Sequence, residues 1–176
     1  MKKLLIIVFV SVSQICFGQN TPSPNLADYL PKDTTTKIHV NQTIEYNIRF
    51  QAEFYKHINT LRKANGKKPL QPDSVLEASA LQHSKYQAYE EEMTHFETNK
   101  NNPYYVGEHV SWRNGHGENI VYGAGGTNPE LSALFAFAIW KSSPGHYENM
   151  LDDYKFVGVA VYDGYATTVF GLFKKN

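Results

Sequence analysis

The chain has 176 residues, of which 41% are hydrophobic and 14% aromatic, and its formal net charge at pH 7 is +0. This composition is typical of one globular domain that is large enough to bury a core, so a second domain is not expected. Positive and negative residues are interspersed without a long block of either sign, which argues against nucleic acid as a partner.

The N-terminus has the parts of a secretory signal peptide. Lys2 and Lys3 supply the charged region, residues 4–12 the apolar region, and Gly18 a small residue at the cleavage point. The apolar run is shorter than the roughly 20 residues that span a bilayer, so we expect no retained transmembrane anchor. The sequence predicts a signal peptide over 1–18, removed near Gly18, and a secreted or periplasmic protein.

Two further features of the N-terminal part concern the mature chain. The only cysteine, Cys16, lies inside the signal peptide, so the mature chain has no disulfide, metal thiolate or thiol nucleophile. Residues 19–42 are rich in proline and threonine, which predicts a flexible leader before a folded domain over 43–176.

The first half of the domain predicts two helices. Apolar residues recur at helical spacing between Thr43 and Ala64, and Gly66 supplies a stop. A second helical pattern runs from about Pro72 to about Met93; His83 lies within it and is interpreted as a packed or surface residue. A loop is expected over 99–103, and residues 104–112 are too short and mixed to assign.

The second half of the domain contains glycines, a helix and a hairpin. Glycines bracket residues 118–121, which predicts a site segment held between flexible hinges. Residues 129–141 form a strongly apolar helix pattern. Two strand-like runs, 156–162 and 166–173, are joined through Asp163 and Gly164, which predicts an antiparallel hairpin with a tight primed turn.

A histidine follows a helix start near residue 144. Ser143 is a suitable N-cap, and Pro144 suits the first helical position. His146 then lies in the first turn, where the positive end of the helix dipole disfavours imidazolium. We expect a neutral ring near pH 7 that can bind a proton or a metal.

Three motifs stand in order along the chain: Thr-His-Phe around His95, Gly-Glu-Asn-Ile around Glu118, and Trp-x-x-Ser-Pro-Gly-His ending at His146. Together they resemble the CAP superfamily, which contains cysteine-rich secretory, venom allergen and pathogenesis-related proteins, and in particular its bacterial secreted SCP-like branch. The resemblance covers about 46–173.

The resemblance implies an α+β fold, a three-layer α-β-α sandwich with a central, mainly antiparallel sheet and helices on both faces. It also implies a cleft that contains His95, Glu118 and His146. A second acid, present in many eukaryotic members, is replaced here by Ser143. Three other acids are candidates to substitute for it, namely Glu97, Glu108 and Glu148.

Two imidazoles and one carboxylate are a suitable ligand set for zinc or another divalent cation. His95, Glu118 and His146 are therefore predicted metal ligands, although they come from separate segments and binding is expected to be weak. His109 and His116 are competing ligands, but their surroundings are more simply explained as loop polarity.

Three functions remain open. A binding module would use a cleft formed by His95, Glu118, Asn119, Ser143, His146 and Tyr147, flanked by aromatic residues, to bind an extracellular lipid, glycan or protein. A hydrolase of peptide or cell-wall material would need a histidine base and a nucleophile such as Ser142 or Ser143. The third is a purely structural polar network. We favour the binding module over an enzyme.

Overall fold

The structure is a computed structural model that describes residues 43–107 and 116–172. The predicted signal peptide and leader lie outside these ranges, as do Glu108, His109 and Trp112. No helix within the described ranges is long and apolar enough to cross a membrane.

A four-stranded sheet has the order β1-β3-β4-β2. The strands are β1 (Gln71–Pro72), β2 (His116–Tyr122), β3 (Phe156–Tyr162) and β4 (Tyr165–Gly171). β3 and β4 pair antiparallel, as do β4 and β2, whereas the short β1 pairs parallel with β3. The sheet is therefore mainly antiparallel, and β2 is its last strand on one side.

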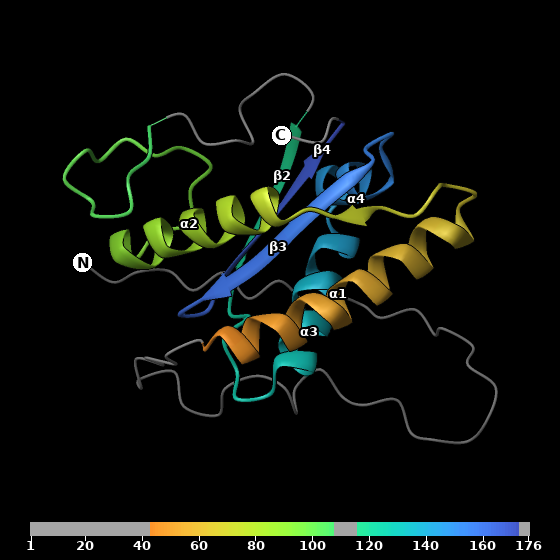
Figure 1. Cartoon of the computed structure of the whole chain (residues 1–176), viewed down its shortest axis with the longest axis horizontal. Coiled ribbons are helices and arrows are strands. Elements are labelled where there is room, and N and C mark those ends of the chain that lie inside the picture. The colour runs from red at the N-terminus through yellow and green to blue at the C-terminus, as the bar shows by residue number, and fades with distance from the viewer. Residues whose placement is uncertain (1–42, 108–115, 173–176) are drawn as a thin grey trace. The chain divides into compact units, whose positions relative to one another are not determined.

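Helices cover both faces of this sheet. They are α1 (Ile44–Ala64), α2 (Ser74–Glu90), α3 (Pro129–Ser142) and α4 (Pro144–Leu151). Figure 1 shows α2 on one side of the strands and α1 with α3 on the other. This arrangement confirms the predicted α+β class and the three-layer sandwich.

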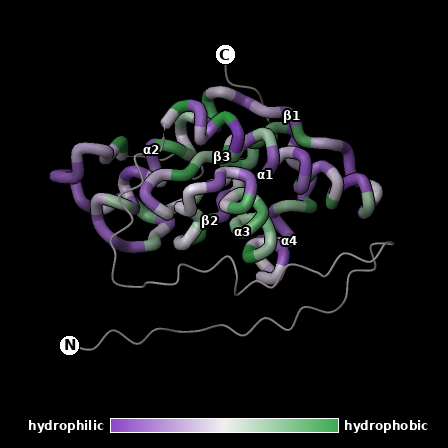
Figure 2. The backbone as a smooth tube through the Cα atoms, turned by 90° about the horizontal axis from the view of Figure 1, so that it is seen from below, coloured by the Kyte–Doolittle hydropathy of each residue, from purple (hydrophilic) through white to green (hydrophobic). Residues whose placement is uncertain are grey.

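Side chains alternate between the two faces of each strand, which produces two cores. Val157, Val159 and Val161 of β3 belong to the larger core with α1, α3 and α4. Ala160 and Val169 belong to the smaller core beneath α2. In Figure 2 the helices on either side of the strands alternate between hydrophilic and hydrophobic colours, as expected for helices with one buried face.

The first predicted helix is confirmed, although its apolar residues are not all buried. The Thr43 side chain accepts a hydrogen bond from the backbone N–H of Tyr46, which caps α1. Ile58 is fully buried, but Ile44 and Ile48 are 83% and 58% exposed. These two isoleucines follow the helical period, but they line a groove between α1 and α2 and do not belong to the large core.

The second helix is shorter than the sequence pattern predicts. α2 begins at Ser74, where Asp73 caps the backbone N–H groups of Val75 and Leu76. It ends at Glu90 because Glu91 adopts a left-handed conformation with φ 53°. The expected extension to Met93 is therefore wrong, since the backbone leaves the helix at Glu91.

The segment that contains Glu118 is a strand and not a hinged loop, which corrects the prediction from its glycines. β2 pairs with β4 along its whole length, with Glu118 opposite Val169. The hairpin is confirmed: Asp163 and Gly164 have φ of 46° and 84°, as a primed turn requires.

The boundary between α3 and α4 matches the sequence at the backbone but not at the cap. Ser143 occupies the N-cap position of α4 and Pro144 begins the helix, yet the serine side chain makes no capping hydrogen bond. Nearby, the indole N–H of Trp140 donates to the carbonyl oxygen of Ile120 at 3.0 Å, which ties α3 to β2.

Candidate functional site

His95 and Glu118 are joined by a short hydrogen bond. His95 follows α2, and its Nδ1 lies 2.7 Å from Oε1 of Glu118 on β2. An ionised carboxylate can only accept, so Nδ1 of His95 carries the proton of this hydrogen bond. The glutamate side chain is 4% exposed and the histidine 39% exposed. Glu118 thus sets the tautomer of a histidine that reaches solvent.

His146 approaches from the opposite helical layer. It lies in the first turn of α4, and its Nδ1 is buried without a hydrogen-bond partner in the described part of the chain. Burial lowers the pKa of this histidine, and the charge of nearby His95 lowers it further. The ring is therefore neutral near pH 7, as expected, although burial and not the helix dipole is the main cause.

Two asparagines fix α4 to β2. The Asn119 amide donates to the carbonyl oxygen of His146 at 3.0 Å. The Asn149 amide donates to Asn119 Oδ1 at 2.9 Å and to the Glu118 carbonyl oxygen at 3.1 Å. Asn119, predicted to line the cleft, is fully buried and holds the backbone of His146 in place.

Successive residues of a strand point to opposite faces, and this explains how the site forms. Glu118 points to the α2 side, where it contacts His95, while Asn119 points to the α4 side, where it contacts His146. β2 therefore brings together side chains from both helical layers.

A second histidine and glutamate lie behind this site. His83 of α2 is fully buried, and its Nδ1 lies 3.0 Å from Oε1 of Glu97. Its Nε2 lies 2.8 Å from the Thr94 carbonyl oxygen and 3.7 Å from Glu118 Oε1. His83 is a packed residue, as expected, but it packs against the site.

The sequence did contain a signal for His83. Together with Leu76, Ala80 and Gln87 it lies on the buried stripe of α2, at helical spacing. A histidine on such a stripe needs hydrogen-bond partners, because a buried imidazole without them is costly. The signal does not say which acid would be the partner.

The segment that carries His95 is anchored to α2. The Tyr86 hydroxyl accepts hydrogen bonds from the backbone N–H groups of Thr98 and Asn99, at 2.8 and 2.9 Å. The Gln82 amide donates to the Tyr104 carbonyl oxygen at 2.7 Å. These contacts hold an irregular segment in a defined position.

The remaining predicted residues have different surroundings. Tyr147 is partly buried and packs against the larger core. The Ser142 hydroxyl donates to the carbonyl oxygen of Ile139 at 2.8 Å, and Ser143 is half-buried. Of the candidate second acids, Glu148 is exposed and Glu97 is buried against His83.

The flanking aromatic residues are engaged elsewhere. The rings of Tyr104 and Tyr162 lie 6.5 Å apart, and the Lys85 ammonium group lies 5.7 Å from each of them. Tyr122 packs on Tyr165 at 4.7 Å. Tyr104 and Tyr122 therefore each pair with a tyrosine of the C-terminal hairpin.

The candidate ligands for a cation are the imidazoles of His95 and His146 and the carboxylate of Glu118, which is already hydrogen-bonded to His95. Across residues 43–107 and 116–172, no group of three or more histidine, cysteine, aspartate or glutamate side chains is arranged to hold a metal ion. Zinc sites in proteins use three or four protein ligands. Metal binding by His95, Glu118 and His146 stays a prediction.

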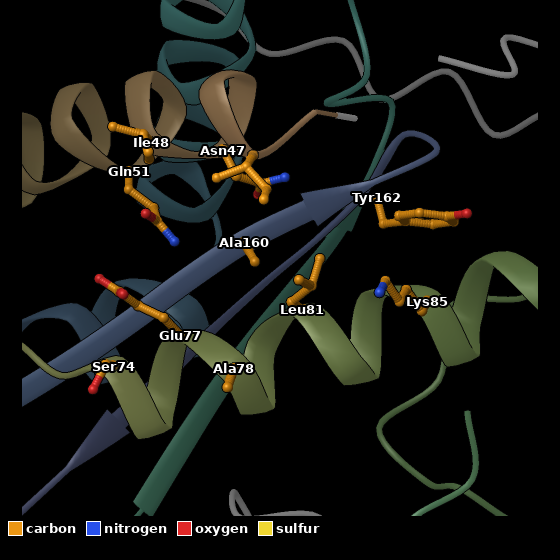
Figure 3. A pocket seen from close by; sticks show the side chains of 11 residues that line it. Asn47, Ile48, Gln51, Ser74, Glu77, Ala78, Leu81, Lys85, Ala160 and Tyr162 are labelled. Atoms are coloured by element: carbon orange, nitrogen blue, oxygen red, sulfur yellow. The ribbon is translucent and has the colours of Figure 1, made fainter. Parts of the chain in front are cut away.

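A separate groove lies between α1 and α2, above β3 (Figure 3). It has a volume of about 360 Å³. Its lining residues are Ile44, Asn47, Ile48, Gln51, Ser74, Glu77, Ala78, Leu81, Lys85, Ala160 and Tyr162. None of the predicted cleft residues belongs to it, so it is distinct from the His95 site.

The chain is similar to several solved structures, and the first one below, with a TM-score above 0.5, supports the fold. An extracellular protein containing an SCP domain from Bacillus anthracis is 22% identical with a TM-score of 0.53, over 73% of this chain and 41% of that chain. A cysteine-rich secretory protein from Staphylococcus aureus is 18% identical with a TM-score of 0.48, over 74% of this chain and 40% of that chain. An outer surface protein from Borrelia burgdorferi is 23% identical with a TM-score of 0.49, over 69% and 90%.

This chain spans only about 40% of the length of the first two proteins. No curated protein sequence matches it. The sequence profile of the cysteine-rich secretory protein family matches residues 55–173, which is more than half of the chain. The protein therefore belongs to the cysteine-rich secretory protein family, also called CAP.

Proposed function

We propose that this protein is a secreted binding protein whose cleft, formed by His95, Glu118 and His146, holds an extracellular ligand. The observation that carries the proposal is the 2.7 Å hydrogen bond between His95 and Glu118. His146 lies near enough for the charge of His95 to lower its pKa. Secretion is supported by the N-terminal pattern and by the extracellular description of the Bacillus anthracis protein of the same fold.

Binding is favoured over hydrolysis because a base is present without a positioned nucleophile. His95 offers a lone pair on Nε2, which suits a general base. The Ser142 hydroxyl is directed to a backbone carbonyl, and Ser143 has no hydrogen bond to a histidine within the described residues. A serine nucleophile needs such a bond to become activated.

One experiment separates binding from hydrolysis. Soluble muropeptides are added to the wild-type protein and to the variants His95→Ala and His146→Ala, and both retention on the protein and fragment mass are measured. We expect retention without a mass change, reduced in both variants. Cleavage that depends on these histidines would establish the hydrolase, and retention that is equal in all three proteins would refute this cleft.

We also propose weak binding of a divalent cation such as zinc as a second function. It is favoured by His146, whose buried Nδ1 has no hydrogen-bond partner in the described residues and whose lowered pKa keeps a lone pair available. His95 Nε2 and the Glu118 carboxylate would be the other protein ligands, with water completing the shell.

Calorimetric titration with zinc tests this second function. We expect weak binding to the wild-type protein that is lost in His95→Ala and in His146→Ala. The matched control is His57→Ala, because His57 is a half-buried histidine of α1 that contacts Glu53 and not the cleft. Zinc binding that survives both cleft substitutions would refute this cation site.

A further inference from the structure

We propose that His83 and Glu97 are positioning residues for the cleft. In this arrangement Glu97 is hydrogen-bonded to His83, the Nε2 side of His83 lies against Glu118 Oε1 at 3.7 Å, and Glu118 orients His95 through a hydrogen bond. The importance of the arrangement for a ligand rests on the proposed function, but its effect on the His95 ring does not.

Burial makes the His83–Glu97 pair rigid and costly to disturb. Both side chains are 0% exposed. The second oxygen of Glu97, Oε2, accepts a hydrogen bond from the backbone N–H of Val106 at 3.0 Å. Each carboxylate oxygen therefore has a donor, as a buried acid requires.

The partners of His83 determine where its protons lie. The Thr94 carbonyl oxygen, 2.8 Å from Nε2, can only accept, so Nε2 carries a proton. Nδ1 faces the Glu97 carboxyl group, and one proton lies between them. The N–H edge of His83 at Nε2 also lies 3.7 Å from Glu118 Oε1, the oxygen that binds His95.

Ser143 stands where many relatives have a second acid, and these contacts indicate which other acid replaces it. Glu148 is exposed, whereas Glu97 joins the same chain of contacts from the α2 side. A second carboxylate is thus present, but it acts through a histidine instead of facing the ligand. Thr94 and Glu97 flank His95 in sequence, so the same contacts fix the backbone on both sides of it.

The proton positions can be read from long-range ¹H–¹⁵N NMR spectra of the histidine rings at pH 7.5. In the wild-type protein we expect His95 to be protonated on Nδ1 and His83 on Nε2. A wild-type His95 that is protonated on Nε2, or a His83 without a proton on Nε2, would overturn the proposal. This reading requires no variant and no ligand.

Two variants test the positioning itself. In Glu97→Gln and in His83→Gln we expect His95 to lose its preference for the Nδ1–H form, because Glu118 is no longer held. Glu53→Gln is the matched control: it alters the Glu53–His57 contact on α1, 3.0 Å in length, and should leave His95 unchanged. An unchanged His95 tautomer in either folded variant would contradict the positioning role.

A zinc titration separates this inference from the proposed function. If the wild-type cleft binds zinc, Glu97→Gln should weaken binding about 10-fold, as is typical for residues behind a metal ligand. If the wild-type protein binds no zinc but the His95 tautomer still changes in Glu97→Gln, the cation function fails and the positioning role stands. Equal zinc affinity together with an unchanged tautomer refutes the positioning role.

Discussion

Glu118 determines which nitrogen of His95 is available to a ligand. Its Oε1 accepts a hydrogen bond from Nδ1–H, so Nδ1 cannot act as a base or a metal ligand while this bond is made. His146 is neutral for a different reason, since burial removes the solvent that would stabilise its charge. Burial therefore favours the neutral form of His146 at neutral pH.

The pKa of His146 should respond to His95. NMR titration should give His146 a pKa below the usual value of about 6.5, and His95→Ala should raise it, because the charge of His95 is one of the two causes of the shift. A lowered folded-state pKa means that the unfolded chain binds the proton more readily. His146 should therefore reduce the free energy of unfolding as pH falls below about 6.5. A pKa that is unchanged in His95→Ala would contradict the proximity of the two rings.

Arg62 is a second residue whose role is clear only in the structure. It is 1% exposed, and its guanidinium group donates to the carbonyl oxygens of Lys68, Met150 and Asp152 at 2.8, 2.8 and 2.9 Å. It thereby holds the end of α4 against α1.

We expect Arg62→Met to lower the free energy of unfolding by about 3 kcal/mol, because four carbonyl groups, that of Tyr154 included, lose a charged donor. Urea denaturation measures this loss. The control is Arg49→Met, which removes an exposed ion pair with Glu130 and should cost less than about 1 kcal/mol. Equal losses in the two variants would contradict the structural role of Arg62.

The sequence motifs predicted His95, Glu118 and His146 because each lies in a short, distinctive pattern. They did not single out His83 and Glu97, which are 14 residues apart in sequence and meet only because the chain turns back after α2. Such a contact depends on tertiary packing, and spacing along a helix cannot reveal it.

Among the elements, β2 is the one for which the prediction of flexible glycine hinges was wrong. Its neighbouring glycines suggested a loop, but the ladder with β4 makes residues 116–122 a strand. The helices and the hairpin were predictable because periodicity, caps and the Asp-Gly turn are local signals.

The outer edge of β3 is protected in a way that no local signal reveals. β1 covers only its first two residues. Beyond them, the Gln51 amide donates to the Val159 carbonyl oxygen at 2.9 Å, and Asn47 exchanges two hydrogen bonds with Val161. α1 therefore takes the place of a neighbouring strand, which prevents pairing with another chain.

The contact between α2 and β3 requires a glycine. A Cβ atom at Gly158 would overlap the backbone of Leu76 and Glu77, so Gly158→Ala must push α2 away from the sheet. We expect a loss of about 3 kcal/mol in urea denaturation. Gly145→Ala is the control, since its Cβ would meet no atom within 4 Å. A Gly158→Ala protein as stable as the control would contradict this packing.

At the scale of the whole molecule, β2 contacts side chains from both helical layers. His95 comes from the α2 side and His146 from the α4 side, while Glu118 and Asn119 of β2 each contact one of them. The resemblance to the family predicts that the two histidines share one cleft, which the helical and strand patterns alone could not have indicated.

The most direct test of one shared cleft is a double-mutant cycle with zinc as the probe, measured by calorimetry. The proteins are the wild type, His95→Ala, His146→Ala and the double variant. If both rings share one ion, each single substitution should weaken zinc binding at least about 10-fold. The zinc affinity of the double variant should then be no lower than that of the single variant with the lower affinity. Absence of binding to the wild type, wild-type affinity in either single variant, or losses that add independently would contradict a shared site.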